Sequence, residues 1–568
     1  MLLIFISWIY IFYAATVWGI TFNNLFKLKE NNHLITQILG LFSITIITAI
    51  SCFFTSINIG FYIVFFLASL LLAYFKRKQL KIYITNLKIR FFNLSKPLQI
   101  AFFIFSWLCL AQASTLPYII DNESYYLQTI KWLNEYGFVK GLSNLHLFFA
   151  QTSGWHILQS AFNFSFLTNK LNDLSAYIYF LVAFYSFEKI NLIFKEKSIQ
   201  IAHYFIAIVP LVSVLFFQFI SSPSPDIPVF LFSFLIFYKL LKNWNNLSIT
   251  DFKNITFICF FILLIKISSV YIVCIPIILL AANYQKFKKS LVTLFSVGLF
   301  VLAIFIGKNQ WLTGYPLFPL QTFKWLTSDY SIPEAYQSFF FKTNKVYAYK
   351  ISYLEYQELS ILQRLKVWLS LPKLHGVFNK LILALIIIFP FFIILKKKIY
   401  QPLLAIYSLA CIQLAVLFIT SPQYRFFLVF ILTLVALLIF IIFQKKILIK
   451  IALPLSLIIT SFILLFPFKL DSFTTNKFTQ NNSSFKLSYI IFPHKNSKYN
   501  YTYHKEKIGN LKYNNPTNQE FFWITGDGDL PVIKKEQLEY FKNKYHYYPQ
   551  LRTGNLKDGF YSKSIDND

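Results

Sequence analysis

Charged side chains are scarce in this chain of 568 residues. They make up 13% of it, while hydrophobic residues make up 57%. A soluble globular domain is nearer half apolar and a quarter charged, so the composition excludes an ordinary soluble protein. Apolar runs of about 17 to 22 residues recur, and this is the length that crosses about 30 Å of hydrocarbon. Because backbone groups in lipid must bond within the chain, the sequence predicts an all-α polytopic membrane protein.

Cysteine is also rare, and its positions exclude a disulfide framework or a metal-binding motif. All five cysteines lie in apolar runs, and none has the spacing of a metal or redox site. They are best interpreted as small buried hydrophobic residues.

Acid is scarcer than base: 23 Asp and Glu stand against 53 Lys and Arg, a net charge of +30. The basic residues form short clusters between apolar runs rather than one patch, which argues against a nucleic-acid partner. Only five of them are Arg. A single acid or Arg at the end of an apolar run is therefore informative.

About fourteen hydrophobic segments can be recognised. They lie near 1–20, 34–54, 57–75, 97–118, 174–194, 201–220, 227–242, 255–265, 269–282, 291–307, 377–395, 402–420, 426–443 and 449–466. The first has no basic residue before it, which predicts an uncleaved anchor rather than a signal peptide. The pieces 255–265 and 269–282 are short and meet at "KISSV", so they are expected to be half-helices or a re-entrant pair.

The lysines predict the topology, because short cytoplasmic loops of membrane proteins are rich in Lys and Arg. With fourteen segments, every basic short loop falls on one side. These loops are 76–90, 195–197, 242–253, 286–289, 396–398 and 444–450. The other side receives the large loops 119–173 and 308–376, "SSPSPD", "KISS", "SPQYR" and the last hundred residues. We expect a bacterial cytoplasmic membrane protein with both termini outside the cytoplasm.

Three regions are expected. Residues 1–96 form an N-terminal three-span region, 97–468 a transmembrane core, and 469–568 a small extracytoplasmic α+β domain rich in Tyr, Asn and Lys. "GDGDLP" in the last region lacks the remaining ligands of an EF-hand loop, so a plain turn is expected there.

Two carboxylates stand together in "PYIIDNESYYLQTIKWLNEYG" (117–137). Asp121 lies at the end of an apolar span, and an amphipathic helix is expected from Ser124 to Glu135, lying on the membrane surface and ending at Gly137. Asp121 either caps this helix or acts as a general base toward an acceptor hydroxyl. Glu123 is a weaker catalytic candidate, and as a first-turn charge it favours the helix.

Three further charges lie at the ends of apolar runs. Asp226 follows two prolines in "SSPSPDIP" and is either a cap or a second carboxylate; with Asp121 it could bind Mg²⁺ or Mn²⁺ through oxygen. Lys266 is either an interfacial anchor that extends toward water or a phosphate contact. Arg425 in "SPQYRFF" is the preferred phosphate contact, because Arg forms bidentate bonds to phosphate.

Aromatic residues and His complete the candidate site. In "WLTGYPLFP" (311–319), Gly and Pro exclude a continuing helix, and Tyr315 could stack on a sugar or lipid or simply close the end of the bundle. His146 and His156 have no metal-ligand partner at helical spacing. Both are interpreted as structural, with His146 the better candidate for substrate contact.

The chain resembles the GT-C class of membrane glycosyltransferases in "IIDNESYYLQTI" after a span, "SPSPD" at the next turn and "YRF" at a late span. It is more closely similar to an uncharacterised bacterial group through "SPSPDIP", "IKISS", "TGYPLFP" and "PQLRTGNLKDGF". The resemblance implies a GT-C-like core, a polyprenyl-phosphate-linked sugar as donor and Asp121 as base. It departs at Tyr125-Tyr126, where relatives often have Tyr-His, at "PQYRF", which lacks a preceding acid, and in having three spans before the catalytic span.

We therefore expect a membrane glycosyltransferase, of the inverting type, that acts at the outer face of the membrane. The expected site contains Asp121, Asp226 and Glu123 as catalytic candidates, and Arg425, Lys266, Tyr125, Tyr126, His146 and Tyr315 as substrate contacts. The expected partners are the lipid bilayer, the polyprenyl-phosphate sugar and a glycan, lipid or protein acceptor. The alternatives are a lipid-linked glycan flippase or transporter and a glycan polymerase or ligase.

Overall fold

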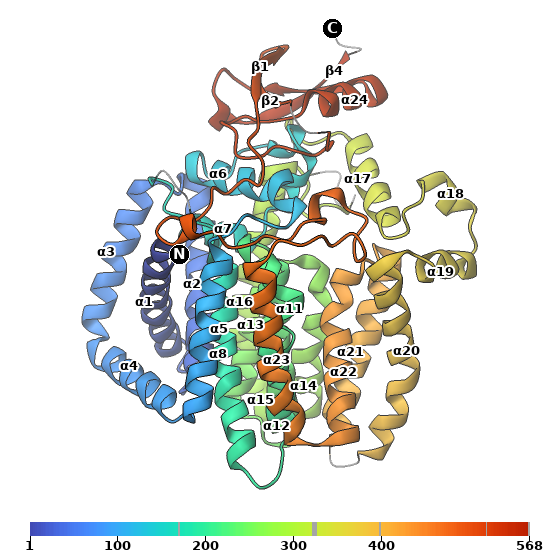
Figure 1. The fold of residues 1–568 in the computed structure, drawn as a ribbon. Coiled ribbons are helices and arrows are strands. Elements are labelled where there is room, and N and C mark those ends of the chain that lie inside the picture. Colours follow the sequence, from blue (N-terminus) through green and yellow to red (C-terminus); the bar gives the residue numbers. More distant parts are fainter. Residues whose placement is uncertain (168–170, 321–325, 397–398, 518–519, 566–568) are drawn as a thin grey trace.

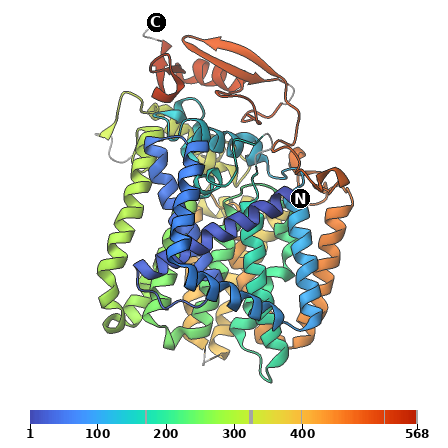
Figure 2. The same ribbon diagram turned by 90° about the vertical axis from the view of Figure 1, so that its left-hand side faces the viewer.

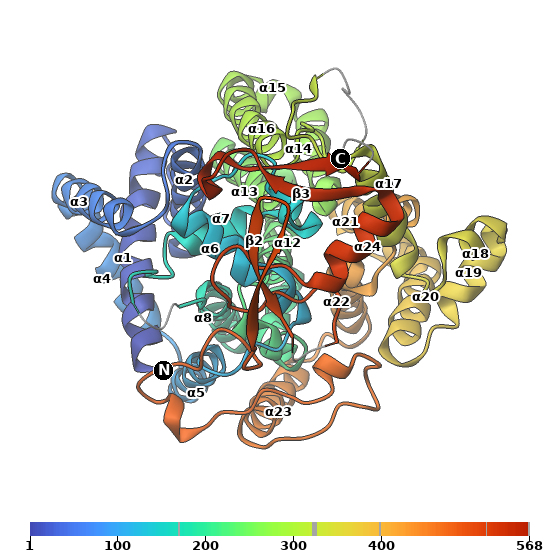
Figure 3. The ribbon, with the colours of Figure 1, turned by 90° about the horizontal axis from the view of Figure 1, so that it is seen from above.

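The computed structural model describes residues 1–167, 171–320, 326–396, 399–517 and 520–565. The fold is a bundle of long helices with a small strand-containing region above one end (Figures 1 and 2). Seen from above, the strands and α24 lie over the middle of the bundle rather than beside it (Figure 3). The predicted fold class, mainly helical with a small C-terminal region that contains strands, is confirmed, while the domain boundaries stay a prediction.

The described helices follow the apolar runs. The N-terminal part contains α1 (Leu2–Leu25), α2 (His33–Phe54), α3 (Ile59–Phe75), α4 (Arg77–Phe92) and α5 (Lys96–Ala113). The middle contains α8 (Leu174–Lys195), α9 (Ile201–Ile206), α10 (Ile208–Leu211), α11 (Ser213–Phe216), α12 (Asp226–Asn243), α13 (Ile249–Ile265), the 3₁₀ helix η6 (Ile267–Val273), α14 (Cys274–Ala282), α15 (Tyr284–Phe287) and α16 (Leu291–Thr313). The last part contains α20 (Lys373–Leu395), α21 (Tyr400–Ile419), α22 (Tyr424–Phe443) and α23 (Lys446–Leu465).

Ten described helices are long and apolar enough to cross a membrane, or up to twelve if each bent pair is one span. One pair is α3 and α4, bent by 87°, and the other is the broken segment from Ile201 to Ser221, bent by 49°. This establishes a multi-pass architecture. Each of the fourteen predicted segments coincides with helical structure, but α13 and the η6–α14 segment are short, and the count of fourteen spans stays a prediction.

Residues 76–90 were expected to be a basic loop, and this is wrong, because they form most of helix α4. No residue of α4 is buried. Its surface combines basic residues with exposed apolar ones, among them Ile82, Ile89 and Phe92. That combination is typical of a helix lying at a membrane surface, so the basic residues are carried by a helix rather than an irregular connection.

The two ends of the bundle differ. The connections after α8, α15 and α22 lie at the end away from the strands, and the elements of loops 119–173 and 308–376 lie at the end beside them (Figure 1). Of the predicted basic loop 396–398, Lys397 and Lys398 lie outside the described residues. The N-terminus is at the end beside the strands, where Leu2 N–H donates to Ile490 O at 2.8 Å.

Loop 119–173 contains the π-helical turn η1 (Asn122–Tyr126), α6 (Leu127–Glu135) and α7 (Gly154–Ser160), and loop 308–376 contains α17 (Glu334–Tyr347), α18 (Tyr353–Glu358) and α19 (Ile361–Leu369). The expectation that the helix at 124–135 lies on the membrane surface is wrong. Gln128 and Lys131, on its polar face, are buried and donate to Gly528 O, each at 2.9 Å. The C-terminal region therefore covers this helix.

In its described residues, the C-terminal region has two antiparallel hairpins and one α-helix. Strand β1 (Tyr503–Ile508) pairs with β2 (Leu511–Pro516), and β3 (Tyr547–Leu551) pairs with β4 (Phe560–Ser564), with α24 (Lys535–Tyr545) before β3. Gly509 and Asn510 form the first turn, and Gly509 has a φ of 57°, as a two-residue hairpin turn requires. "GDGDLP" is not helical or extended, as expected of a turn.

Helices α1 and α2 cross at two glycines. A Cβ placed on Gly40 would lie 1.9 Å from Ala15 O, and one on Gly19 would lie 2.0 Å from Thr36 O. Small residues at such crossings let helix backbones approach closely in membranes, where packing is a main source of helix association. The N-terminal helix pair therefore depends on the absence of side chains at these two positions.

We expect Gly40→Ala to destabilise the protein by about 1–3 kcal/mol, because the added methyl group overpacks a backbone contact. Thermal unfolding of purified protein in detergent measures this. Gly554→Ala is the matched control, since a Cβ there meets nothing within 4 Å. An unchanged midpoint of thermal unfolding for Gly40→Ala would show that helices α1 and α2 accommodate the added methyl group without loss of stability.

Candidate functional site

Asp121 and Arg425 form an ion pair between loop 119–173 and the start of α22. Arg425 Nη1 donates to Asp121 Oδ2 at 2.8 Å, and the two side chains are 37% and 19% exposed. Of the two alternatives for Asp121, capping of the following helix is wrong, since its side chain makes no capping bond. Its carboxylate is bonded instead to the Arg predicted from its position as a phosphate contact.

Asp226 and Lys266 form a second pair. Asp226 is the first residue of α12, and Lys266 lies between α13 and η6 with an extended backbone, φ −154° and ψ 107°. Lys266 Nζ donates to Asp226 Oδ1. The predicted break at "KISSV" is confirmed, and it places the lysine at the junction of two helical pieces rather than within one.

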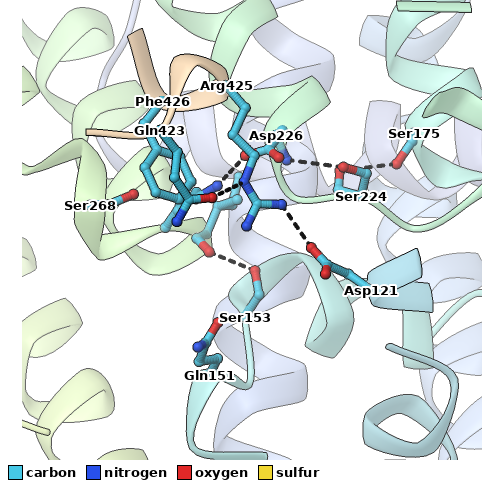
Figure 4. A network of polar contacts seen from close by, with 12 residues as sticks. Asp121, Gln151, Ser153, Ser175, Ser224, Asp226, Ser268, Gln423, Arg425 and Phe426 are labelled. Carbon is cyan, nitrogen blue, oxygen red and sulfur yellow. Dashed lines mark hydrogen bonds and ion pairs between the residues drawn. The ribbon is translucent and has the colours of Figure 1, made fainter. Parts of the chain in front are cut away.

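These four side chains make up one group, here named the charge cluster. Figure 4 shows the Arg425 guanidinium pointing toward Asp121, with Asp226 in the same network of polar contacts. Arg425 interacts electrostatically with both carboxylates, and Lys266 interacts with both carboxylates and with Arg425. The cluster joins four separate chain segments and contains two acids and two bases, so its formal charges cancel.

Neighbouring side chains orient the two cationic residues, Arg425 and Lys266. Gln423 Oε1 accepts from Arg425 Nε at 3.1 Å. The ring of Phe426 lies 4.3 Å from Lys266 Nζ and 5.0 Å from the Arg425 guanidinium carbon, within the range of cation–π attraction. Both residues flank Arg425 in "SPQYRFF", so the motif contained a signal that the sequence interpretation did not use.

Ser153 is a supporting residue that sequence reasoning missed. Its hydroxyl donates to Ile265 O at 2.6 Å, directly before Lys266. Gln151, two residues before Ser153, is exposed although most of the surrounding loop is buried. Figure 4 places Gln151 and Ser153 beside the charge cluster. No sequence motif marks either residue, because their position depends on loop 119–173 folding against α13.

Tyr125 and Tyr126 lie behind Asp121 and are both buried. Burial raises the pKa of each phenol, and the charge of Asp121 raises it further. The Tyr126 ring centroid is 4.6 Å from that of His156, and burial lowers the pKa of His156 to about 3. Tyr125, Tyr126 and His156 are thus neutral, buried groups packed near Asp121.

Glu123 is close to Asp121 in sequence but has different contacts. It is fully buried, and its carboxylate accepts hydrogen bonds from Ser497, Tyr501 and the backbone of Lys498 in the C-terminal region. Burial raises the pKa of Glu123, and these bonds act in the opposite direction. The structure therefore places Glu123 with the C-terminal region and not with the charge cluster.

Tyr315 and His146 also lie away from the cluster. Tyr315 is 3% exposed and packs in an apolar group with Phe318 and Tyr336, and the helix before it ends at Thr313, as predicted from the Gly and Pro residues. His146 lies under the C-terminal region, where its Nδ1 accepts from Phe148 N–H at 3.2 Å. Its Nε2 then carries the proton and faces Trp523 O at 3.4 Å.

The charge cluster offers few ligands for a divalent cation. Within the described parts of the chain, no group of three or more His, Cys, Asp and Glu side chains comes together. Asp121 and Asp226 are each already paired with a base, and the two bases would repel a cation. The predicted binding of Mg²⁺ or Mn²⁺ by Asp121 and Asp226 stays a prediction.

The buried His146 predicts a pH-dependent stability. Burial lowers its pKa from 6.5 to about 4, so between these values the folded protein binds fewer protons than the unfolded chain. The free energy of unfolding therefore falls as the pH drops through this window, by at most about 3 kcal/mol from this residue. Thermal unfolding measured from pH 7 to pH 4 tests the slope.

His146→Gln removes the titratable group, and we expect a shallower loss of stability with falling pH than in the wild type. His504→Gln, on the exposed part of β1, is the control and should keep the wild-type slope. If stability falls with pH equally steeply in His146→Gln and in the wild type, the lowered pKa of His146 does not cause the pH dependence.

Comparison with known proteins places the chain in a family. No curated protein and no solved structure matches it. Residues 1–432 match a family described as a domain of unknown function, DUF8201, and the match includes all four members of the charge cluster. Since it covers more than half of the chain, this protein belongs to the DUF8201 family.

Proposed function

We propose that this protein is a membrane glycosyltransferase that moves a sugar from a polyprenyl-phosphate donor to an acceptor hydroxyl. The observation that carries the proposal is the charge cluster, in which a partly exposed carboxylate, Asp121, lies 2.8 Å from the guanidinium of Arg425 at one end of a membrane bundle. Transfer from a phosphate-linked sugar needs a base for the acceptor and cations for the leaving phosphate. Both kinds of group are present.

The donor phosphate binds to Arg425 and Lys266. The phosphodiester of such a donor offers Arg425 two oxygens for bidentate bonding, whereas Asp121 accepts one bond from it, so the phosphate competes with Asp121 for the guanidinium. Its arrival separates Asp121 from Arg425. In the absence of the sugar donor, the charge of Asp121 is therefore neutralised by Arg425. When the sugar donor is bound, Asp121 becomes a free carboxylate that can act as the general base.

Transfer then needs one displacement. Asp121 removes the proton from the acceptor hydroxyl, the acceptor oxygen forms a bond to the anomeric carbon, and the bond from that carbon to the phosphate oxygen breaks. The electron pair leaves with the polyprenyl phosphate, whose added negative charge Arg425 and Lys266 stabilise, while Asp121 keeps the proton. A single displacement inverts the anomeric carbon. Asp226 keeps Lys266 charged and in place, since an ammonium group with a partner is favoured in a poorly solvated site.

The acceptor and the lipid have different routes to the cluster. Asp121 and Gln151 belong to the loop under the C-terminal region, from which a glycan, lipid or protein acceptor would arrive. Lys266 adjoins Ile267 and Val270 of η6, which are 47% and 43% exposed. These apolar side chains offer a surface along which the polyprenyl chain can lie in the bilayer.

The proposed location is the bacterial cytoplasmic membrane, with the charge cluster and both termini outside the cytoplasm. The lysine distribution supports this orientation, because the basic connections lie at the end of the bundle away from the C-terminal region (Figure 1). A flippase or transporter was the alternative from sequence. The charge cluster favours the enzyme, because it lies at one end of the bundle beside loop 119–173.

Asp121→Asn is expected to lower the rate of sugar transfer by 10²- to 10⁴-fold, since it removes the general base but keeps the shape of the side chain. The measurement is transfer by purified protein from a panel of polyprenyl-phosphate sugars. Asp329→Asn is the matched control, because Asp329 also pairs with an arginine, Arg552, at 2.7 Å, but on the exposed surface. A wild-type rate of sugar transfer by Asp121→Asn would show that Asp121 is not the general base.

The orientation predicts which engineered cysteines react from outside. In intact cells, a membrane-impermeant maleimide should label Gly554→Cys in the C-terminal region, and should leave Lys78→Cys and Lys286→Cys unlabelled until the cells are opened. All three positions are exposed, so accessibility reports the side of the membrane. Labelling of Lys78→Cys but not Gly554→Cys in intact cells would reverse the orientation.

A further inference from the structure

Glu123 is a fully buried carboxylate whose hydrogen-bond donors come mainly from the far end of the chain. Its oxygens accept from Ser497 Oγ at 2.5 Å, Tyr501 OH at 2.8 Å and the backbone N–H of Lys498 at 2.9 Å. A fourth donor is the side-chain amide of its neighbour Asn122, at 3.0 Å. We name Glu123 with Ser497, Lys498 and Tyr501 the Glu123 clasp.

The backbone of the same turn is also bonded to the C-terminal region. Glu123 O accepts from the backbone N–H groups of Thr525 and Gly526, both at 2.9 Å. The Thr525 hydroxyl lies 3.0 Å from Glu123 O and 2.9 Å from Ser124 O. A π-helical turn is an uncommon local structure that is frequent at functional sites, and here residues some 400 positions later satisfy its carbonyl groups.

The donors of the clasp are neutral. Lys498 contributes its backbone N–H, while its ammonium group donates to Phe478 O at 2.5 Å. Hydroxyl and amide groups provide all four hydrogen bonds to the Glu123 carboxylate, and the Lys498 ammonium interacts with it through its charge alone.

Asp121 thus lies between two attachments. On one side Arg425 binds its carboxylate, and on the other the clasp binds the residue two positions later. Once the donor phosphate has displaced Asp121 from Arg425, the second attachment still holds the turn that places the carboxylate. A general base needs a position accurate to about 1 Å, because an error of that size costs up to about 100-fold in rate.

We propose that Glu123 is a positioning residue, through which the C-terminal region fixes Asp121 for catalysis. This inference rests on the proposed function. Glu123 does not act on the substrate, because its carboxylate is enclosed by protein, whereas the Asp121 side chain is 19% exposed. The C-terminal region is then part of the catalytic apparatus, although none of its residues belongs to the charge cluster.

The test uses the full-length protein with one change on each side of the clasp. Glu123→Gln keeps the shape of the side chain and replaces an acceptor oxygen with a donor. Tyr501→Phe removes one donor to Glu123 and leaves the sequence of loop 119–173 unchanged. Glu539→Gln, on the exposed face of α24, is the control. Each is examined by hydrogen exchange of the backbone at 122–126 and 497–501, and by transfer kinetics at varied donor concentration.

We expect both clasp variants to exchange at least about tenfold faster in these two segments, with the control unchanged. We expect kcat to fall about 10- to 100-fold, while the KM for the donor stays within about twofold, because Arg425 and Lys266 lie on other segments. A general loss of folding would instead raise exchange across the helices as well, and Tyr501→Phe, the milder change, guards against that outcome.

Three results would overturn the proposal. Unchanged exchange in both variants would show that the clasp does not hold the turn. Faster exchange with unchanged kcat would show that the clasp is real but does not position the base, and would leave the proposed function intact. Absence of transfer by the wild type with every donor would overturn the proposed function and, with it, the catalytic role of Glu123.

Discussion

The ion pair of Asp121 and Arg425 is the contact on which the site depends. It joins residues 304 positions apart at a distance of 2.8 Å, and so fixes the start of α22 against loop 119–173. The pair is only partly exposed, and charges in such places interact more strongly than in water. Because removing one partner leaves the other charge without compensation, the two segments form a single unit.

The pair of Asp226 and Lys266 also joins separate segments, but different backbone features place its two residues. Proline residues before Asp226 end the preceding segment, and the break at Lys266 brings a lysine to the same place from another direction. The charge cluster therefore combines four ends of helical segments. Helix ends are suited to this task, because their side chains reach the surface of the bundle while the apolar bodies of the helices stay together.

The C-terminal region adds an upper layer to this arrangement. It covers α6 and bonds to the η1 turn, so residues beyond 490 complete the polar contacts of residues 122–131. A loop that had to bury this many polar groups without partners would not be stable. The long polar end of the chain is thus a structural requirement of the loop that contains Asp121.

The sequence alone determined the membrane class, the positions of the apolar helices, the break at Lys266 and the small terminal α+β region, because hydrophobic run length, Pro, Gly and charge act locally along the chain. It also singled out Asp121, Asp226, Lys266 and Arg425 as unusual charges in apolar surroundings. Only the tertiary structure decided that these four come together, that Glu123 faces away from them, that Tyr315 and His146 pack elsewhere, and that 76–90 is a helix. Partners hundreds of residues apart are chosen by how helices and loops pack in space, and no local pattern in the chain records that choice.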